Sequence, residues 1–415
     1  MPATPVPSTS ALTARDRLLA ELGEALEALS AAGLGRRLPR IEAVDGAVLL
    51  VEGRRLIGWC ANDYLGLAGH PALAAAVADA AAEFGVGSRA SRLLCGTTRW
   101  HAALEAALAA WFAAEAALVF PTGYHANLGA LGALLGPGDA VAVDRLAHAS
   151  LVDAARATQA RLRIFRHNDP GHAADVLARL PGRRRAIVTE GLFSMEGDRA
   201  PLAALLDAAE RTDALVYVDD AHGAFVLGAT GRGAPEAAGV PMDRLIYMAT
   251  LGKALGGQGG FVAGPRVLIE YLVNRARPFL YTTGLATPLA AAASAALHVA
   301  QDEPWRRQRL WALAGRLHAR LAARGWGGGE PSPILPIVLG EPDAARAASE
   351  LLARLGHFVP PIRPPTVPRG TSRLRISLSA AHTEAQADAL ADALAAVLPA
   401  TPAAHPRRAA GPYAL

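Results

Sequence analysis

The sequence predicts an α/β protein with a seven-stranded, mostly parallel sheet in a large domain and a smaller α+β domain at the C-terminal end. Two observations support this class. Seven short apolar runs alternate with turns and helical segments between residues 116 and 263, a pattern typical of a parallel sheet covered by helices on both faces. Beyond about residue 300, two strand-like runs and two helical segments follow instead. With 52% apolar residues in 415, the chain can bury a core of this size.

The predicted organisation has four parts. Residues 1–61 form an N-terminal segment with a helix and a β-hairpin, residues 62–300 the large α/β domain, residues 301–399 the small α+β domain, and residues 400–415 a tail. The tail is rich in Pro, Ala and Arg, and residues 1–12 hold several prolines, so we expect both ends to be disordered.

The N-terminal segment begins with an amphipathic helix over about residues 15–32. Its leucines recur at helical spacing on one stripe, and two glycines end it. Two β-rich runs at 47–51 and 55–59 are separated by a Glu-Gly pair, which predicts a hairpin. After residue 67 the sequence predicts two Ala-rich helices.

The strands of the large domain are assigned to apolar runs bounded by turns. They are residues 116–120, 140–143, 161–165, 185–189, 214–218, 245–248 and 260–263. Asp169 and Asp198 each come shortly before a proline, which predicts capping side chains at two helix starts. In the small domain we expect strands at 334–339 and 373–378 and helices at 343–355 and 384–398.

Composition and charge narrow the class of protein. The net charge of +4 is small for this length and no run of five like charges occurs, so nothing indicates a nucleic-acid partner. Two cysteines, Cys60 and Cys95, make neither a disulfide framework nor a metal set, which fits a reducing compartment. The N-terminus lacks a secretory pattern, and the most apolar stretch, residues 285–300, predicts a packed helix and not a membrane span. We therefore expect a cytoplasmic protein without a bound metal.

Lys253 is the only lysine in the chain, which otherwise uses arginine as its basic residue. A guanidinium stays protonated in a protein, whereas a desolvated lysine amine can lose its proton and become a nucleophile. Lys253 is therefore the first candidate for covalent chemistry. The alternative is that one lysine persists by chance, and the neighbouring motifs decide between these interpretations.

Polar motifs follow several predicted strands, at the edge where ligands bind in open α/β sheets. An acid and an imidazole follow one strand as Asp219 and His222, and a glycine turn at Gly123 opens a helix after another. Residues 144–150 and 190–198 add polar groups after two more. Each motif alone has a structural explanation, as a capped loop or an ordinary turn. Together with the single lysine they indicate a phosphate site, an acid for a pyridine nitrogen and an amine for an aldehyde, which is a pyridoxal phosphate site.

Several multi-residue motifs stand in the order found in the α-oxoamine synthases, which are pyridoxal phosphate enzymes of fold type I. They include residues 62–67, 219–222 and 250–253. The chain resembles that family from about residue 36 to residue 398. The resemblance implies a fold type I transferase, an acyltransferase activity and pyridoxal 5'-phosphate as the cofactor.

The resemblance also implies a set of catalytic and cofactor contacts. Lys253 would form the Schiff base, Asp219 would hold the ring nitrogen, and His148 would stack on the ring face. The other cofactor contacts that it implies are Gly123, Tyr124 and Thr250 at the phosphate, and Ser194 and His222 near the phenolic oxygen. The segment with Thr282 and Thr283 would reach the phosphate from a neighbouring subunit, so the resemblance implies a homodimer with shared sites. Catalysis would rest on Lys253, His148, Asp219 and His222.

Within the family, residues 362–382 look like the branch whose product is 8-amino-7-oxononanoate, made from L-alanine and a pimeloyl thioester in biotin biosynthesis. By resemblance, Arg363 would hold the carboxylate of the amino acid. The other substrate contacts implied are Asn62, His148, Thr366 and Arg36, with Arg37 as the alternative to Arg36. The acyl donor would be pimeloyl-CoA or pimeloyl on a carrier protein.

Two other interpretations stay open at this point. A sibling synthase that uses glycine, such as 2-amino-3-ketobutyrate CoA ligase or 5-aminolevulinate synthase, would share the cofactor site, although residues 362–368 argue against it. A nucleotide-binding module built on residues 255–260 would carry no covalent chemistry, but that run has neither a Walker lysine nor Rossmann spacing. Arg89 stands where the family usually has a small residue, and Trp100 and His125 are also unusual, which bears on the acyl chain and not on the reaction.

Overall fold

The computed structural model of the chain describes residues 13–326 and 329–398. Its large sheet contains the seven expected strands, each within two residues of the expected bounds. They are β4 (Ala116–Phe120), β5 (Ala140–Asp144), β6 (Arg161–Phe165), β7 (Arg185–Glu190), β8 (Leu215–Asp219), β9 (Ile246–Thr250) and β10 (Gly260–Gly264). Their order across the sheet is β4-β10-β9-β8-β7-β5-β6. β10 is antiparallel to both neighbours, whereas the other pairs are parallel.

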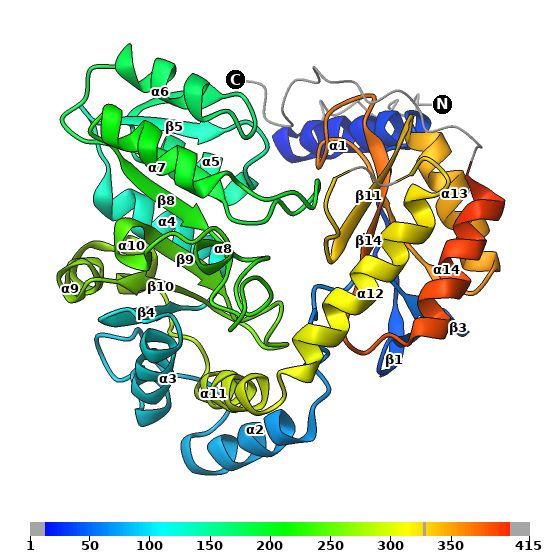
Figure 1. Cartoon of the computed structure of the whole chain (residues 1–415), viewed down its shortest axis with the longest axis horizontal. Coiled ribbons are helices and arrows are strands. Elements are labelled where there is room, and N and C mark those ends of the chain that lie inside the picture. Colours follow the sequence, from blue (N-terminus) through cyan, green and yellow to red (C-terminus); the bar gives the residue numbers. More distant parts are fainter. Residues whose placement is uncertain (1–12, 327–328, 399–415) are drawn as a thin grey trace, which may run out of the picture.

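Helices cover both faces of this sheet (Figure 1). The helices packed on one face are α4 (Gly123–Leu134), α5 (Ala149–Ala157), α9 (Arg266–Arg275) and α10 (Arg277–Leu280). Those packed on the other face include α3 (Arg99–Trp111), α6 (Pro170–Ala178), α7 (Leu202–Arg211) and α11 (Thr287–Asp302). All five residues of β5 are buried, because a strand covered on both faces exposes neither set of alternating side chains.

Alanine lets the helices at the edge of this domain approach closely. α11 is the expected packed helix over residues 285–300, and eleven of its residues are buried. It lies against α2 (Pro71–Phe84) and α3. No helix in the described part of the chain is both long and apolar enough to cross a membrane.

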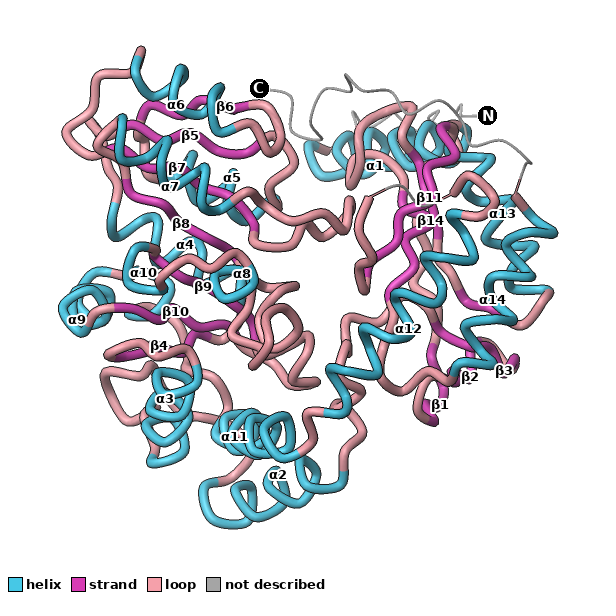
Figure 2. Tube along the Cα trace, viewed as in Figure 1, coloured by secondary structure: helices cyan, strands magenta, loops and turns pink. Residues whose placement is uncertain are grey.

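The smaller part of the molecule is built from two distant stretches of the described chain, residues 14–58 and 305–397 (Figure 2). A four-stranded sheet has the order β1-β2-β3-β12, built from β1 (Ile41–Asp45), β2 (Val48–Val51), β3 (Arg54–Gly58) and β12 (His357–Phe358). A three-stranded sheet has the order β11-β14-β13, built from β11 (Ile334–Gly340), β14 (Ser372–Ser377) and β13 (Pro361–Ile362). The accompanying helices are α1 (Ala14–Ala31), α12 (Trp305–Ala322), α13 (Pro342–Arg354) and α14 (Glu384–Val397). The division of the chain at residues 61, 300 and 399 stays a prediction.

The expected helix at the N-terminus is present as α1, where Thr13 and Asp16 form a reciprocal capping box. The expected cap at Asp169 is also present, since its side chain accepts the N–H of His172 at the start of α6. The expected cap at Asp198 is wrong. α7 begins after Pro201 without a side-chain cap, because the carboxylate of Asp198 contacts His167 instead. Residues 1–12 and 399–415, which include the predicted tail, lie outside the described residues.

Candidate active site

Four neighbouring parallel strands end in polar residues at one edge of the large sheet. The last residues of β5, β7, β8 and β9 are Asp144, Glu190, Asp219 and Thr250. The carboxyl ends of parallel strands meet at the same edge, so these four side chains and the loops that follow them lie close together. Lys253 comes three residues after the end of β9 and belongs to this edge.

The amine of Lys253 contacts an imidazole. Its Nζ lies 2.7 Å from Nε2 of His222. Removal from water lowers the pKa of Lys253 to about 8, although the carboxylates of Asp219 and Glu190 oppose that shift. An amine with this pKa is partly neutral near physiological pH and can act as a nucleophile or a base.

His222 is a neutral imidazole held between two partners. Its Nδ1 lies 2.6 Å from the hydroxyl of Tyr64, a fully buried side chain. Burial first, and then the positive charges of Lys253 and Arg375, lower the pKa of His222 well below its ordinary value. A neutral imidazole carries one N–H, so one ring nitrogen donates while the other accepts. His222 therefore orients the amine without adding charge to the site.

Asp219 lies at the centre of a buried hydrogen-bond network. Its Oδ2 accepts from Nδ2 of Asn127 at 2.7 Å, and its Oδ1 accepts from the N–H of Ala221 at 3.0 Å. Asn127 also donates to Ser150 Oγ at 2.8 Å. Ser150 Oγ in turn lies 2.8 Å from Nδ1 of His148, whose ring is exposed. The network fixes the carboxylate of Asp219 and the imidazole of His148 relative to each other.

The glycine turn at the start of α4 faces the end of β9. A Cβ added at Gly123 would lie 3.7 Å from the Cβ of Thr250, and one added at Gly260 would lie 2.6 Å from the Cα of Gly123. Thr250 Oγ1 donates to the carbonyl of Gly259 and accepts the N–H of Gly252. A helix N-terminus beside a buried hydroxyl suits a phosphate group. Tyr124, the other residue predicted here, donates from its hydroxyl to Asp153 at 2.6 Å.

Ser194 and Asn62 are joined by an arginine that sequence reasoning missed. Nε of Arg375 donates to the carbonyl of Ser194, and both of its terminal nitrogens lie 3.3 Å from Oδ1 of Asn62. Arg375 is 7% exposed, and its hydrogen-bond partners in the described residues are neutral oxygens. Burying a guanidinium without a carboxylate is costly, so this cation is suited to an anionic ligand.

The signal for Arg375 was present in the sequence but ambiguous. It stands inside the predicted strand 373–378, in which Arg373 also occurs at the alternate position. Arg373 has a carboxylate partner, because it contacts Glu196 at 2.9 Å. Only the tertiary structure distinguishes the paired arginine from the one that lacks an acidic partner.

The other predicted substrate residues line a separate pocket. Arg36, Arg37, Arg363 and Thr366 border a cavity of about 440 Å³ in the smaller part of the molecule. Terminal nitrogens of Arg363 donate to the carbonyls of Gly33 and Gly35, and Arg36 donates to the carbonyl of Pro364 at 2.9 Å. The structure thus brings Arg36 and Arg363 together and places Arg375, not Arg363, in the network with Asn62. The Pro364–Pro365 peptide, which directly follows Arg363, is cis.

The predicted intersubunit contacts lie on the surface of the single chain. Tyr281 is 74% exposed, Thr283 is also exposed, and Thr282 is partly buried. Gly284, which follows, donates to the carbonyl of Ala90 at 3.0 Å. Arg89, the unusual residue in that neighbouring loop, is exposed and has a φ of 68°, a left-handed conformation that favours glycine.

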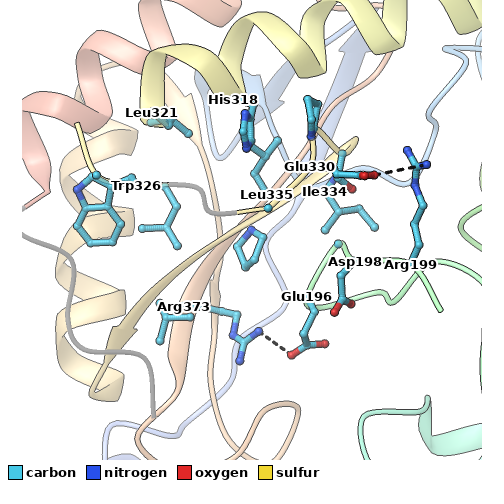
Figure 3. A pocket seen from close by; sticks show the side chains of 18 residues that line it. Glu196, Asp198, Arg199, His318, Leu321, Trp326, Glu330, Ile334, Leu335 and Arg373 are labelled. Atoms are coloured by element: carbon cyan, nitrogen blue, oxygen red, sulfur yellow. Dashed lines mark hydrogen bonds and ion pairs between the residues drawn. The ribbon is translucent and has the colours of Figure 1, made fainter. Parts of the chain in front are cut away.

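A larger cavity of about 730 Å³ lies between the loop at 196–199 and β11 (Figure 3). Arg373 and Glu196 pair across one side of it, and Trp326 and His318 close another. None of the predicted site residues lines this cavity. The described residues contain no cluster of potential metal ligands.

The side chains at the sheet edge fit pyridoxal phosphate. Lys253 supplies an amine for the aldehyde, Asp219 a buried carboxylate for the pyridine nitrogen, and Gly123 with Thr250 a place for the phosphate. Oε1 of Glu190 is buried and has no hydrogen-bond partner within the described residues. Because buried polar atoms are normally hydrogen-bonded, this oxygen is available to a bound ligand.

The fold and this site define a fold type I pyridoxal phosphate enzyme. The chain belongs to the family described as aminotransferase class I and II, whose family model matches residues 54–394. It is 53% identical over 390 residues to the 8-amino-7-oxononanoate synthase of Anaeromyxobacter sp. (strain K), which covers 94% of this chain and 98% of the relative. It is 50% identical over 365 residues to the enzyme of the same name from Alkalilimnicola ehrlichii, over 87% of this chain and 93% of the relative.

Solved structures agree with this placement. The serine palmitoyltransferase of S. paucimobilis, solved with a bound PLP–myriocin aldimine, matches with a TM-score of 0.86 at 32% identity, over 92% of this chain and 98% of that one. The 8-amino-7-oxononanoate synthase of Francisella tularensis matches with a TM-score of 0.71 at 28% identity, over 82% of this chain and 96% of that one.

Proposed function

We propose that this chain is an 8-amino-7-oxononanoate synthase, which condenses L-alanine with a pimeloyl thioester and releases a thiol and CO₂ in biotin biosynthesis. The observation that carries the proposal is the meeting of the only lysine, Lys253, with His222 beside the buried carboxylate of Asp219. The identity of 53% to a relative of that name supports the particular reaction.

Bound pyridoxal phosphate supplies an electron sink for the alanine carbon that loses its proton. Lys253 Nζ accepts this proton, which a pKa of about 8 allows. Asp219, which Asn127 orients, would keep the ring nitrogen of bound pyridoxal phosphate protonated. The alanine carbon would then bond to the thioester carbonyl carbon while the carbon–sulfur bond breaks, and the departing thiolate takes a proton from water. After loss of CO₂, Lys253 would return its proton to the same alanine carbon.

Arg375 is our candidate for the carboxylate of alanine. It is buried, it lies against Ser194 and Asn62, and it lacks an acidic partner in the described residues. A planar guanidinium can bind a carboxylate with two hydrogen bonds. Arg363, which the resemblance assigns to this role, lines the pocket with Arg36 and Thr366. We propose these three as substrate contacts in which the arginines meet an anionic part of a substrate.

We also propose a homodimer in which Thr282 and Thr283 complete the partner's phosphate site. The exposure of Tyr281 and Thr283 supports this, as does an apolar face of α1 that no described part of the chain covers. Its exposed residues are Leu18, Leu19, Leu22, Leu26 and Leu29. Large exposed apolar surfaces mark interaction sites. The free thiols of Cys60 and Cys95 support the proposed cytoplasmic location.

One product assay tests the proposed reaction. The purified enzyme, loaded with pyridoxal phosphate, is given alanine, glycine or serine with pimeloyl, acetyl or succinyl thioesters, on CoA and on carrier protein. We expect alanine and pimeloyl to be preferred. Comparable condensation of glycine with acetyl- or succinyl-CoA would assign the chain to a glycine-using sibling. The absence of visible cofactor absorbance would reject the cofactor chemistry itself.

A further inference from the structure

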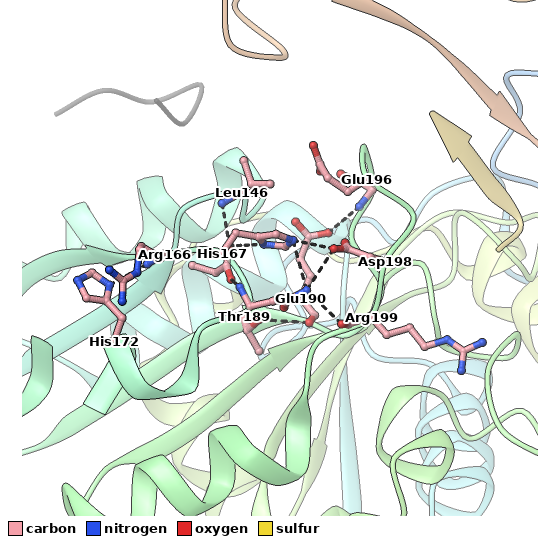
Figure 4. A network of polar contacts seen from close by, with 12 residues as sticks. Leu146, Arg166, His167, His172, Thr189, Glu190, Glu196, Asp198 and Arg199 are labelled. Carbon is pink, nitrogen blue, oxygen red and sulfur yellow. Dashed lines mark hydrogen bonds and ion pairs between the residues drawn. The ribbon is translucent and has the colours of Figure 1, made fainter. Parts of the chain in front are cut away.

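One imidazole outside the Lys253 cluster bridges two segments of the candidate active site. His167 follows β6 and lies between Asp144, the last residue of β5, and Asp198, in the loop after β7. Figure 4 shows its ring directed at Asp198. Its Nδ1 lies 2.9 Å from Oδ1 of Asp144, and its Nε2 lies 2.9 Å from Oδ2 of Asp198. The side chain of His167 is 16% exposed and that of Asp144 is fully buried.

The geometry determines the charge of His167. Ionised carboxylates only accept hydrogen bonds, so each of the two contacts needs an N–H on the ring. A neutral imidazole has one N–H, and only the imidazolium has two. Burial disfavours that charge, but the hydrogen bonds and charges of Asp144 and Asp198 outweigh burial and raise the pKa of His167 to about 10. His167 is therefore a cation at physiological pH.

The first carboxylate belongs to the turn that carries His148. Oδ1 of Asp144 also accepts the N–H of Leu146 at 2.8 Å, and the carbonyl of Asp144 accepts the N–H of Ala147. These bonds shape residues 145–148, so that His148 can cap α5. Oδ2 of Asp144 accepts the N–H of Asn168, which fixes the segment of His167 to the same turn.

The second carboxylate belongs to the loop that carries Ser194. The carbonyl of Asp198 accepts the N–H of Phe193 at 2.9 Å, which closes the loop over residues 193–198. The ring of Phe193 meets the imidazole edge-on, with centroids 4.4 Å apart. Asn168 donates to Oδ2 of Asp198 at 3.2 Å as well. The other charges near His167 are neutralised, because Glu196 pairs with Arg373 and Arg166 with Asp169.

We propose that His167 is a positioning residue that, as an imidazolium, holds the turn of His148 and the loop of Ser194 at a fixed separation. The proposal rests on the proposed function for the roles of those two residues. A ring between them would meet His148 on its face and Ser194 near its phenolic oxygen, so loss of the bridge would loosen two sides of the cofactor together.

Hydrogen–deuterium exchange on the cofactor-free protein tests the bridge itself. We expect His167→Gln to raise amide exchange in residues 145–150 and in residues 191–197, because one amide group cannot donate to two carboxylates in this geometry. His172→Gln is the matched control, since His172 accepts the N–H of Arg166 at 2.9 Å and should leave both segments unchanged. Asp198→Ala, a change at a half-exposed side chain, should raise exchange in residues 191–197 alone.

Each outcome decides the proposal. Increased exchange in both segments of His167→Gln, absent from His172→Gln, supports it. An increase in one segment only, or an equal increase in the control, overturns it. If His167→Gln does not fold, the proposal is tested by amide exchange at residues 191–197 of Asp198→Ala. Unchanged exchange there would overturn the proposal that His167 bridges the two segments.

Equilibrium binding of pyridoxal phosphate tests the link to the site. We expect the Kd for pyridoxal phosphate to rise about tenfold in His167→Gln, because the loss of one charge-assisted hydrogen bond corresponds to about that factor. The Kd of His172→Gln should stay unchanged. If both segments loosen but the Kd does not change, the positioning role is overturned. If the wild type binds no pyridoxal phosphate, the proposed function fails, and the exchange result still decides whether His167 bridges the two segments.

Discussion

The burial of Lys253 controls the pH at which its amine can react. Since the pKa of Lys253 is lowered to about 8, its neutral fraction rises steeply between neutral and mildly alkaline pH. We expect the rate at which cofactor-free protein takes up pyridoxal phosphate to rise with pH through a midpoint near that value, because only the neutral amine attacks an aldehyde. Visible absorbance after mixing, recorded over a pH series, measures this rate.

The variant Lys253→Arg serves as the control, because a guanidinium stays protonated and should give no such absorbance. A wild-type rate that keeps rising toward the ordinary lysine value of 10.5 would contradict the burial argument.

Arg375 and Arg363 are the two candidates for binding the carboxylate of alanine, and matched substitutions distinguish between them. We expect Arg375→Lys to raise the KM for alanine by about one to two orders of magnitude, because lysine cannot reproduce two charge-assisted hydrogen bonds worth ~1.5 to 3 kcal/mol. Arg363→Lys should change the alanine KM less, since Arg363 lines the other pocket. Steady-state kinetics with alanine as the varied substrate measures both. A larger increase in the KM for alanine in Arg363→Lys than in Arg375→Lys would instead assign the carboxylate contact to Arg363.

The sequence allowed single site residues to be predicted where a reactive side chain stands at the end of a predicted strand. Lys253, Asp219 and His222 stand just at or after a strand end, and the structure brings them together there. Asn127 and Tyr64, which hold Asp219 and His222, were not predicted as partners, because such contacts join segments about 90 and 160 residues apart. Their cofactor and substrate roles stay predictions.

At the scale of elements, α4 and β10 approach each other closely enough to exclude side chains. A Cβ at Gly260 would lie 2.6 Å from the Cα and 2.7 Å from the N of Gly123. We expect Gly260→Ala to push the start of α4 away from β10 and to weaken binding of pyridoxal phosphate by about tenfold or more, measured by equilibrium titration.

Gly132→Ala is the matched control in the same helix, because a Cβ there meets nothing within 4 Å. It should leave the Kd unchanged and raise the free energy of unfolding by about 0.5 to 1 kcal/mol, the usual gain from replacing glycine inside a helix. An unchanged Kd in Gly260→Ala would show that the close approach does not serve the cofactor.

Most of the large-domain strands were predictable because they are short and largely apolar, and burial on both faces leaves that signature. β6 differs, because it lies at the edge of the sheet and its two arginines are exposed. β12 and β13 were not, since each has two residues and exists only by pairing with a partner. β1 was missed because its five residues are all exposed and carry no clear alternation. The cap expected at Asp198 failed because a tertiary contact with His167 outweighed a local one.

At the scale of the whole molecule, the exposed face of α1 and the exposed Tyr281 lead us to expect a dimer. Sedimentation velocity should give a mass of twice 42.9 kDa. Because Thr282 and Thr283 are proposed to reach the partner's site, dilution below the dissociation constant should lower cofactor occupancy. Sedimentation at a series of concentrations, with absorbance at the cofactor band, measures both together. A monomer that keeps full cofactor occupancy would contradict the shared site.

The parallel pairing of β3 with β12 has a consequence for the order in which the protein is made. Gly58 in β3 pairs with Phe358 in β12. One edge of β3 therefore stays unpaired until β12 has been synthesised, about 300 residues later. At roughly 5 to 20 residues per second, this delay is on the order of 15 to 60 s. During that interval the large sheet, which is contiguous in sequence from residue 116 to residue 264, is complete, whereas β3 presents an unpaired edge to other nascent chains. β1 and β2 can pair with their neighbours early, whereas β3 completes its pairing only after the large sheet has been synthesised. The free edge of β3 is thus a place where a chaperone could protect the nascent chain from aggregation.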